Sequence, residues 1–262
     1  FDGTGDYLSI PHNASLSWIG TVDGSVEAWV YMNSFTGSPT IISKSDISNS
    51  SYPNFNVAFN TSGNLLGFVG NSGSPGSALA TVTSATTVPL NTWTHIAFTR
   101  RYVGGGAQNE YRVFINGVLQ GSTTAANPTD ARAGVFDIGA TTSGTVAPTN
   151  GYISNLRFFN NSIPPAYQTT STTNGTQIFT PSTEALTAIS GTSLLTCQSN
   201  RFKDNSSNNF TITQAGDAVV SKHNPFDTGS SYSNYGSGAF FTGQTNYAIF
   251  SAEVLTGDFT IE

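Results

Sequence analysis

Short segments in which apolar and polar residues alternate recur along this chain, and they limit its fold more than any other feature. Within residues 25–32, one face carries Val26, Ala28, Val30 and Met32, and the other carries Glu27, Trp29 and Tyr31. Alternation with a period of two is typical of a β-strand that is buried on one side. Further strands are predicted at residues 54–60, 65–69, 93–100, 110–115, 118–120 and 151–160.

Turn signals separate these predicted strands. The pair Asn116-Gly117 stands between two apolar segments. It predicts a two-residue hairpin, because both residues of such a turn must adopt positive φ. No stretch of the sequence shows a sustained helical period. Many short strands without intervening helices favour an antiparallel β-sandwich over a fold in which strands and helices alternate.

Composition narrows the classes of function. Charged residues make up 9% of the 262 residues, against roughly 25% in an average soluble domain. The formal net charge is −6 and the basic residues are scattered, which excludes nucleic acid as a partner, because phosphate binding needs clustered cations. No apolar run approaches the ~20 residues that cross a bilayer, so no membrane is expected as a partner. The single cysteine, Cys197, excludes a disulfide within the chain and is interpreted as a small buried hydrophobe.

The end of the chain repeats the pattern of its beginning. Phe1-Asp2-Gly3 is matched by Phe241-Thr242-Gly243, and each triplet is followed by a tyrosine in an alternating segment. Asp23–Glu27 is matched by Asp258–Glu262 at nearly the same spacing. A period of this length is a whole domain rather than a solenoid unit. We therefore interpret the chain as a piece of a tandem array of sandwich domains.

Four segments resemble, in order, the laminin-G-like domains of the concanavalin A-like lectin/glucanase superfamily. They are residues 1–8, residues 26–30, residues 93–100 with 113–117, and residues 151–160. The resemblance implies an all-β, antiparallel sandwich of the jelly-roll type. It also implies that a domain begins before its Phe-Asp-Gly segment, with strands that residues 193–198 and 204–212 resemble.

The resemblance divides the chain into three parts. Residues 1–167 form a sandwich that lacks its first strands, residues 168–192 form a Thr/Ser-rich connector with little core of its own, and residues 193–262 carry the opening strands of a second repeat. Half a sandwich is not stable alone. We therefore predict that residues 193–262 pair with a sandwich of the 1–167 type, either by folding back or by exchange between copies. We favour exchange, because the same contact repeated from copy to copy builds an open filament.

A second resemblance concerns function. Residues 194–212, with Phe226 and Gly236-Ser237-Gly238, resemble laminin-G-like proteins of marine bacteriophages. This implies a non-enzymatic virion structural or fibre protein, on a virion or an extracellular surface. Its partners would be other copies of itself, other virion proteins or a surface glycan. Two alternatives stay open: a carbohydrate-binding adhesin or surface filament protein of a marine bacterium, and an enzyme that acts on polysaccharide.

The sequence assigns no catalytic residue. β-Glucanases of the superfamily carry carboxylates at alternate positions of one strand, because retaining hydrolysis needs two carboxyl groups about 5 Å apart. No glutamate of this chain has an acidic residue two positions away: Glu27, Glu110, Glu184, Glu253 and Glu262. His12, His95 and His223 occur without a nucleophile motif, and His95 is interpreted as a packed or surface histidine.

Asp2 and Asp6 are the candidates for a metal site. Domains of the resembled family bind calcium through the aspartate of the Phe-Asp-Gly segment and an acidic residue near the end of the last strand, where this chain has the neutral Ser154 and Asn155. Calcium takes six to eight oxygen ligands, so the loss of one carboxylate should weaken the site. The alternative is that both aspartates form turns by accepting hydrogen bonds from their own backbone. No other cofactor is indicated.

Aromatic residues are the candidates for stacking on sugar rings. Trp18, Trp29 and Trp93 are also normal core residues of a sandwich, and Trp29 and Trp93 lie in strands that we expect to be largely buried. The preferred glycan-binding candidates are therefore tyrosines predicted in loops, namely Tyr52, Tyr102, Tyr232 and Tyr235.

Overall fold

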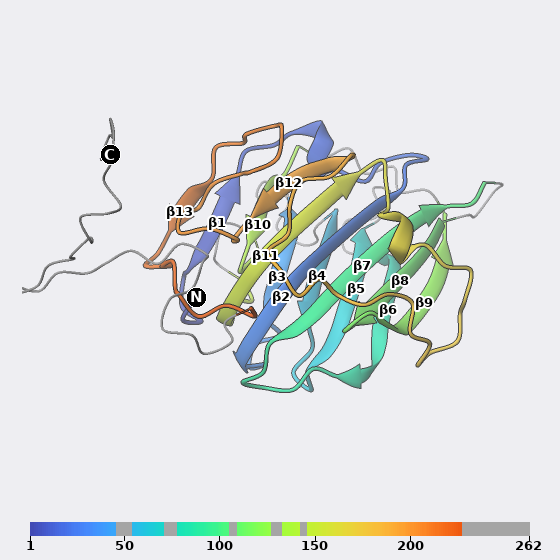
Figure 1. Cartoon of the computed structure of the whole chain (residues 1–262), viewed down its shortest axis with the longest axis horizontal. Helices are drawn as coiled ribbons and strands as arrows, with labels where there is room; N and C mark the ends of the chain where they lie inside the picture. Colours follow the sequence, from blue (N-terminus) through green and yellow to red (C-terminus); the bar gives the residue numbers. More distant parts are fainter. Residues whose placement is uncertain (46–53, 71–77, 105–108, 127–132, 142–145, 227–262) are drawn as a thin grey trace, which may run out of the picture.

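The computed structural model describes residues 1–45, 54–70, 78–104, 109–126, 133–141 and 146–226, and it folds them into two packed antiparallel sheets (Figure 1). The seven-stranded sheet has the order β13 (Thr213–Ala215), β1 (Tyr7–Ile10), β10 (Val135–Ile138), β3 (Thr40–Ser45), β4 (Phe55–Phe59), β5 (Asn64–Gly70), β6 (Ala78–Thr87). The six-stranded sheet has the order β12 (Thr192–Thr196), β11 (Asn150–Asn160), β2 (Gly24–Ser34), β7 (Thr94–Tyr102), β8 (Asn109–Ile115), β9 (Val118–Ala125). The antiparallel β-sandwich predicted from the sequence is confirmed.

Helix is confined, in the described residues, to two single 3-10 turns, η1 (Ala14–Leu16) and η2 (Pro165–Tyr167). None of the helices found there has the length and apolar character that a membrane span would require.

The core lies between the sheets and follows the predicted alternation. On β2, the residues Val26, Ala28, Val30 and Met32 all belong to the main buried cluster. The ring of Trp18 stacks between Phe55, at 4.9 Å between ring centroids, and Phe158, at 5.3 Å. Its indole nitrogen donates a hydrogen bond to the carbonyl oxygen of Phe159 at 2.9 Å. Trp18 thus ties the two sheets together, and each such buried side chain contributes roughly 1.5–3 kcal/mol.

The predicted hairpin at Asn116-Gly117 is confirmed. Ile115 pairs with Val118 across the turn. Asn116 has φ of 50° and Gly117 has φ of 77°, which is the geometry of a two-residue turn with both central residues in the left-handed region.

Residues 192–215 fold back onto the sandwich formed by the preceding part of the chain. Leu194 in β12 pairs with Phe158 in β11, and β13 pairs with β1, so each sheet gains one edge strand. The predicted contact between this segment and a sandwich of the 1–167 type is therefore confirmed, in the fold-back form. The assignment of the segment to a second repeat and the exchange between copies stay predictions, and residues 227–262 lie outside the described residues.

The turn after β12 is held by one buried carboxylate. Asp204 is 1% exposed. Its two oxygens accept backbone N–H groups of Leu195, Ser206 and Phe210 at 2.8–3.1 Å. This explains why the Asp-Asn-Ser-Ser sequence follows the strand, because an ionised carboxylate can satisfy several donors that the turn leaves unpaired.

The connector at residues 168–192 contributes to a core, which corrects the prediction that it has little core of its own. Phe179 and Leu186 are each 6% exposed. Phe179 packs with Phe114, Leu119 and Tyr167 on the outer face of the six-stranded sheet. Within this segment, Gln177 forms an isolated β-bridge with Val118. Two well-placed apolar side chains suffice for this burial, although Thr, Ser and Gly dominate the segment.

Candidate functional site

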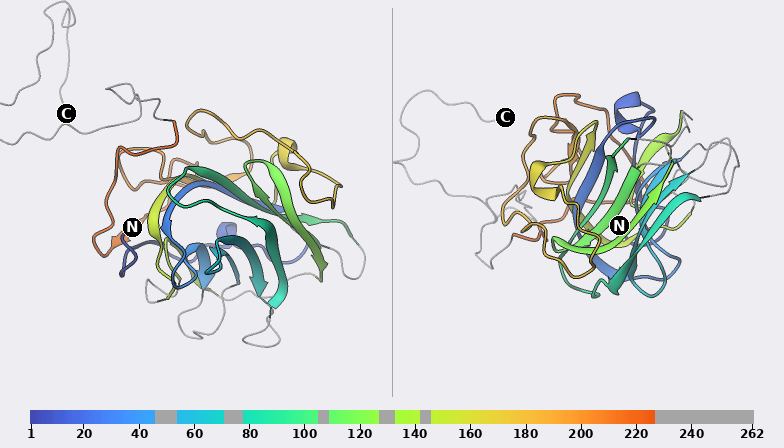
Figure 2. Two further views of the ribbon diagram at one scale, coloured as in Figure 1. Left: turned by 90° about the horizontal axis from the view of Figure 1, so that it is seen from below. Right: turned by 90° about the vertical axis from the view of Figure 1, so that its right-hand side faces the viewer.

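Two segments cover the outer face of the six-stranded sheet, and the candidate site lies beside the second of them. Residues 163–187, called the seal, cross the β7–β9 side of this face, and residues 217–226, called the strap, reach the β11–β2 side (Figures 1 and 2). The left view of Figure 2 shows the seal in gold and the strap in orange.

Under the seal lies a buried ionic cluster around Glu27, which is 2% exposed. Its carboxylate contacts Nε2 of His95 at 3.1 Å and Arg157 at 2.6–2.8 Å, and it accepts a hydrogen bond from the hydroxyl of Tyr167. Arg157 also donates to the carbonyl oxygen of Thr187 at 2.9 Å, which fixes the end of the seal. Every partner is enclosed, so the cluster holds the seal in place and offers no surface to a substrate.

The pKa of Glu27 reflects this enclosure. Burial alone would raise it, but the hydrogen bond and charge of His95, the charge of Arg157 and the Tyr167 hydroxyl outweigh burial and lower the pKa below its usual value of 4.5. The interpretation of His95 as a packed histidine is confirmed, since the residue is 0% exposed.

The structure brings Asp2 and Asp6 together and adds Asp217 from the strap. One carboxylate oxygen of each lies within 4.8 Å of the others. Asp6 accepts the backbone N–H of Asp2 at 3.0 Å and that of Asp217 at 2.8 Å. Asp2 also accepts the N–H of Thr4 at 2.7 Å, as the turn alternative predicts. The hydrogen bond of Asp217 to Asp6 and the charges of Asp6 and Asp2 raise the pKa of Asp217, as expected of crowded carboxylates.

Ser154 and Asn155 do not join this acidic cluster. Asn155 has φ of 53° and sits at the register shift of β11, where its Oδ1 accepts the N–H of Leu186 at 2.7 Å. Its Nδ2 donates to Oγ of Ser154 at 2.8 Å. These two neutral residues anchor the seal and line the groove described next.

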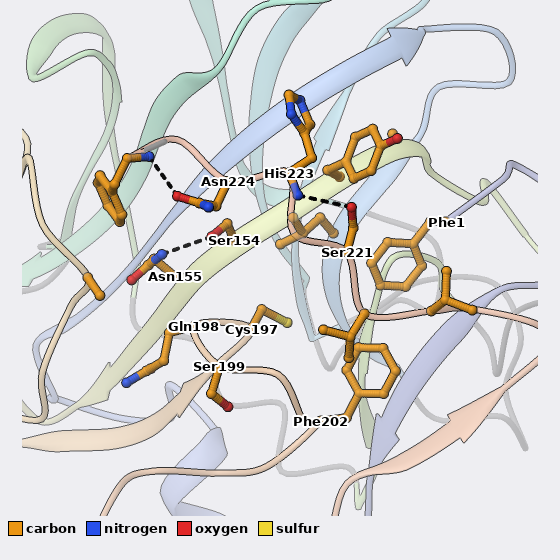
Figure 3. A pocket seen from close by; sticks show the side chains of 17 residues that line it. Phe1, Ser154, Asn155, Cys197, Gln198, Ser199, Phe202, Ser221, His223 and Asn224 are labelled. Atoms are coloured by element: carbon orange, nitrogen blue, oxygen red, sulfur yellow. Dashed lines mark hydrogen bonds between the residues drawn. The ribbon is translucent and has the colours of Figure 1, made fainter. Parts of the chain in front are cut away.

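A groove of about 70 Å³ lies between β11, the turn after β12 and the strap, and we call it the β11 groove (Figure 3). Neutral polar side chains and aromatic rings surround it: Ser154, Asn155, Gln198, Ser199, Ser221, Asn224, Phe1, Tyr152, Phe202, His223 and Phe226. Cys197 lines the same groove, and burial raises the pKa of its thiol to about 12, so it behaves as an unreactive group there.

Gln198 is the least satisfied polar side chain of the β11 groove. Its Nε2 donates to the carbonyl oxygen of Leu186 at 3.0 Å. Its Oε1 is buried and has no hydrogen-bond partner among the described residues. An unpaired buried acceptor costs free energy until a donor reaches it, so this oxygen marks a place where a ligand hydroxyl would be stabilised.

A wider cleft of about 540 Å³ joins the acidic cluster to Tyr152. Asp2, Asp6 and Asp217 line one part of it, and Tyr152 and Ser221 line it as well as the β11 groove. The strap therefore borders both openings.

Among the predicted glycan-binding tyrosines, Tyr102 lines neither the β11 groove nor the wider cleft. Tyr102 lies at the end of β7, where its backbone N–H donates to Asp23 at 2.8 Å. Tyr52, Tyr232 and Tyr235 lie outside the described residues. The expectation that Trp29 and Trp93 are largely buried core is also corrected, because both are partly exposed and Trp29 faces outward with Glu27. For Trp29, the alternation along β2 was the signal that could have identified its outward orientation.

Comparisons with known proteins agree with this architecture. A sequence model of the concanavalin A-like lectin/glucanases superfamily matches residues 2–166. No curated protein matches the chain.

Among solved structures, a candidate carbohydrate-binding protein from Bacteroides ovatus superposes with a TM-score of 0.50 and 14% identity, over 85% of this chain and 61% of that one. The carbohydrate-binding domain of a Ruminococcus gnavus sialidase, bound to α2,3-sialyllactose, has a TM-score of 0.44 and 16% identity, over 60% and 89%. Domain 4 of a Geobacillus stearothermophilus arabinanase, in complex with arabinotriose, has a TM-score of 0.43 and 23% identity, over 63% and 71%. At these identities the likeness to the Bacteroides protein shows the shared fold.

Proposed function

This chain belongs to the concanavalin A-like lectin/glucanase superfamily, and we propose that it is a non-enzymatic module that binds carbohydrate in the β11 groove. The observation that carries the proposal is the buried, unpaired Oε1 of Gln198 at the wall of that groove. A sugar hydroxyl is a donor of the right size to pair with it.

The lining of the β11 groove suits a neutral polar ligand with apolar faces. Ser154, Asn155, Ser199 and Asn224 offer hydroxyl and amide groups, and aromatic rings stand beside them. Sugars present the matching surface, hydroxyl groups around the ring edge and C–H groups on the ring faces. Sites of this composition fix the orientation of a ligand with few polar groups while apolar contact supplies the affinity.

We further propose that the module does not hydrolyse its ligand. Glu27 is enclosed by its ionic cluster, and Glu110 is paired with Arg101 and Arg112 at 2.8–3.5 Å. Neither carboxylate lines the β11 groove or the wider cleft. Incubation with a panel of β-glucans should release no reducing sugar. Release that is abolished by Glu27→Gln or Glu110→Gln would contradict this part of the proposal.

Calcium is proposed at Asp2, Asp6 and Asp217. The hydrogen bond to Asp6 and the charges of Asp6 and Asp2 raise the pKa of Asp217, and a hard cation bound through the carboxylate oxygens would relieve this repulsion. These three residues would hold the ion, and its role would be to fix the base of the strap beside the wider cleft.

For the complete protein, we propose a tandem array of such modules in a virion structural or fibre protein, or alternatively in a bacterial surface adhesin. The support is the second Phe-x-Gly segment at Phe241. Its partners would be further copies of the module and a surface glycan. Mass spectrometry of purified virions or of cell-surface fractions would distinguish the two settings.

Binding to an immobilised glycan array tests the main proposal. The wild-type chain should bind a subset of glycans, and Gln198→Leu should weaken binding about tenfold, because a hydrogen bond of roughly 1–1.5 kcal/mol is lost. Gln168→Leu is the matched control: Gln168 is exposed and also donates to a backbone carbonyl oxygen, that of Ile163. Absence of binding by the wild type, or an equal loss in both variants, would contradict the proposal.

A further inference from the structure

Three aromatic side chains form a row across neighbouring strands on the outer face of the six-stranded sheet. Tyr152 of β11 pairs directly with Tyr31 of β2, and Trp93 immediately precedes β7 on the other side of Tyr31. The ring centroids of Tyr31 lie 5.7 Å from those of both Tyr152 and Trp93. All three side chains are partly exposed. We call these three residues the aromatic row.

One side chain of the strap covers the aromatic row. The imidazole of His223 lies 4.7 Å from the ring of Tyr31, 4.8 Å from that of Tyr152 and 5.2 Å from that of Trp93, measured between centroids. His223 itself is exposed on its other side. A small planar ring of the chain thus occupies the space above three aromatic faces and edges.

At its His223 end, the strap meets the aromatic row through ring contacts. The backbone N–H of His223 donates to Oγ of Ser221 at 3.1 Å, and Nδ2 of Asn224 donates to the carbonyl oxygen of Lys222 at 2.9 Å. Both bonds lie within the strap, and the first is drawn in Figure 3. The strap is attached to the sandwich at its other end, where the backbone N–H of Asp217 donates to Asp6 at 2.8 Å and the carbonyl oxygen of Ala218 accepts from Nε2 of Gln214 in β13 at 2.6 Å. The strap can therefore move at its His223 end without disrupting the strand pairing of either sheet.

While the strap covers the aromatic row, two indole N–H groups have no hydrogen-bond acceptor among the described residues. The indole nitrogens of Trp93 and of the neighbouring Trp29 are buried and have no hydrogen-bond partner among the described residues. Burial of an unpaired N–H is unfavourable. A ligand with acceptor oxygens that replaced the strap could satisfy these donors, whereas the imidazole of His223 does not.

We propose that the aromatic row is a stacking site for a sugar ring and that His223 is an internal competitor that must leave before the sugar binds. This inference rests on the proposed glycan-binding function and adds to it a second subsite. Tyr152 and His223 also line the β11 groove, so the two subsites are continuous and an oligosaccharide could occupy both. The C–H face of a pyranose stacks on aromatic rings at their exposed faces. When a covering side chain occupies a site, the apparent affinity falls by the fraction of molecules in which the site is open.

The test is glycan binding by His223→Ala. On the array of the preceding section, this variant should bind the same glycans three- to tenfold more tightly than the wild type, because the aromatic row is open in more molecules. Lys222→Ala, one residue earlier on the exposed strap, is the matched control and should bind as the wild type does. In the His223→Ala background, Tyr31→Leu and Tyr152→Leu should each reverse the gain.

The outcomes separate this inference from the proposed function. If His223→Ala binds as the wild type does while Gln198→Leu still weakens binding, glycan binding in the β11 groove is supported and the stacking site on the aromatic row is overturned. If His223→Ala weakens binding, His223 belongs to the binding surface and the competitor role is overturned. If no variant binds any glycan, both proposals fail. Circular dichroism and thermal unfolding of the two leucine variants establish that a reversal is not caused by unfolding.

Discussion

The seal and the strap cover the same face of the same sheet, yet they are attached in different ways. The seal forms backbone hydrogen bonds with the β8–β9 hairpin. The N–H of Leu119 donates to the carbonyl oxygen of Thr176 at 2.8 Å, and the N–H of Ile178 donates to that of Gly117 at 2.9 Å. It also buries the stacked rings of Tyr167 and Phe179, 3.8 Å apart. The strap has an exposed histidine in contact with three rings and leaves two indole donors unpaired.

We interpret the difference as that between a segment that stabilises the fold and a segment that covers the proposed binding site. The seal buries several apolar side chains, and both oxygens of Glu27 beneath it are paired, although Nδ1 of His95 has no hydrogen-bond partner among the described residues. Its removal would expose this packed cluster, so the seal is part of the core. A segment that leaves buried donors unpaired can be replaced by a ligand that pairs them. The comparison therefore supports the proposal that glycan binds on the β11–β2 side of the sheet.

Glu27→Ala should destabilise the part of the fold that lies under the seal, and it has the largest expected effect on the free energy of unfolding. It leaves the buried Arg157 without its carboxylate partner, and loss of one partner of a buried ion pair costs about 3–5 kcal/mol. Urea unfolding measures the change. Glu184→Ala is the control, since Glu184 is exposed and such a surface substitution should change stability by no more than about 0.5 kcal/mol. Equal losses in the two variants would contradict the structural role of the Glu27 cluster.

The same cluster predicts a pH dependence. The pKa of Glu27 is lowered in the folded state below the usual 4.5, so its contribution to stability is complete above the unfolded value and is lost as the pH falls through the folded value. The gap in unfolding free energy between the wild type and Glu27→Gln should therefore shrink as the pH falls below about 4.5. A gap that is constant between pH 7 and the acid limit would argue against ionised Glu27.

Calcium should strengthen the attachment of the strap to the sandwich at Asp217, and so stabilise the folded protein. At a concentration a hundredfold above its Kd, a ligand that binds only the folded state stabilises it by about 2.7 kcal/mol. The thermal midpoint should rise with calcium, and Asp217→Asn should reduce the rise. The exposed Glu184→Gln is the control. A rise that is unchanged in Asp217→Asn, or absent in the wild type, would contradict calcium binding at the acidic cluster.

Gly117→Val should loosen the seal from the hairpin side. Gly117 has φ of 77°, and a Cβ at this position would overlap the carbonyl oxygen of Phe179. The expected loss is about 2 kcal/mol, from a β-branched residue in the left-handed region beside a backbone that cannot move freely. Gly175→Ala is the control, because Gly175 has φ of 89° and open space around it. A loss of unfolding free energy no larger than that of the control would show that close packing of the seal against the hairpin does not constrain residue 117.

His223→Ala should have the smallest effect on stability, within about 0.5 kcal/mol, because the residue is exposed. Phe179→Ala, the corresponding loss of a ring from the seal, should cost about 3 kcal/mol or more. Thermal unfolding of both variants measures the difference directly. Similar losses would mean that the strap is as much a part of the core as the seal.

Local patterns in the sequence were sufficient to predict the β-sandwich fold. The alternation on β2 predicted which residues face the core, and Asn116-Gly117 predicted its hairpin, because both depend on residues adjacent in the chain. The seal was missed because only Phe179 and Leu186 mark it within a Thr- and Ser-rich segment.

The site itself depends on contacts that no local pattern contains. Asp217 joins Asp6 across 211 positions of sequence. Gln198 and Tyr152 meet only because β12 folds back beside β11. The sequence alone named Asp2 and Asp6 as metal candidates, whereas Asp217 beside them and the aromatic row become apparent only from the three-dimensional arrangement of the strap.

Hydrogen–deuterium exchange with and without bound oligosaccharide tests the central claim most directly. With the best glycan from the array at saturating concentration, the account predicts that exchange changes in residues 151–155, 197–202 and 217–226, which border the β11 groove and form the strap. Residues 163–187 of the seal should show high protection in both states. Changes confined to the seven-stranded sheet, with the groove and strap unaffected, would contradict the account and place the binding site on the other face of the sandwich.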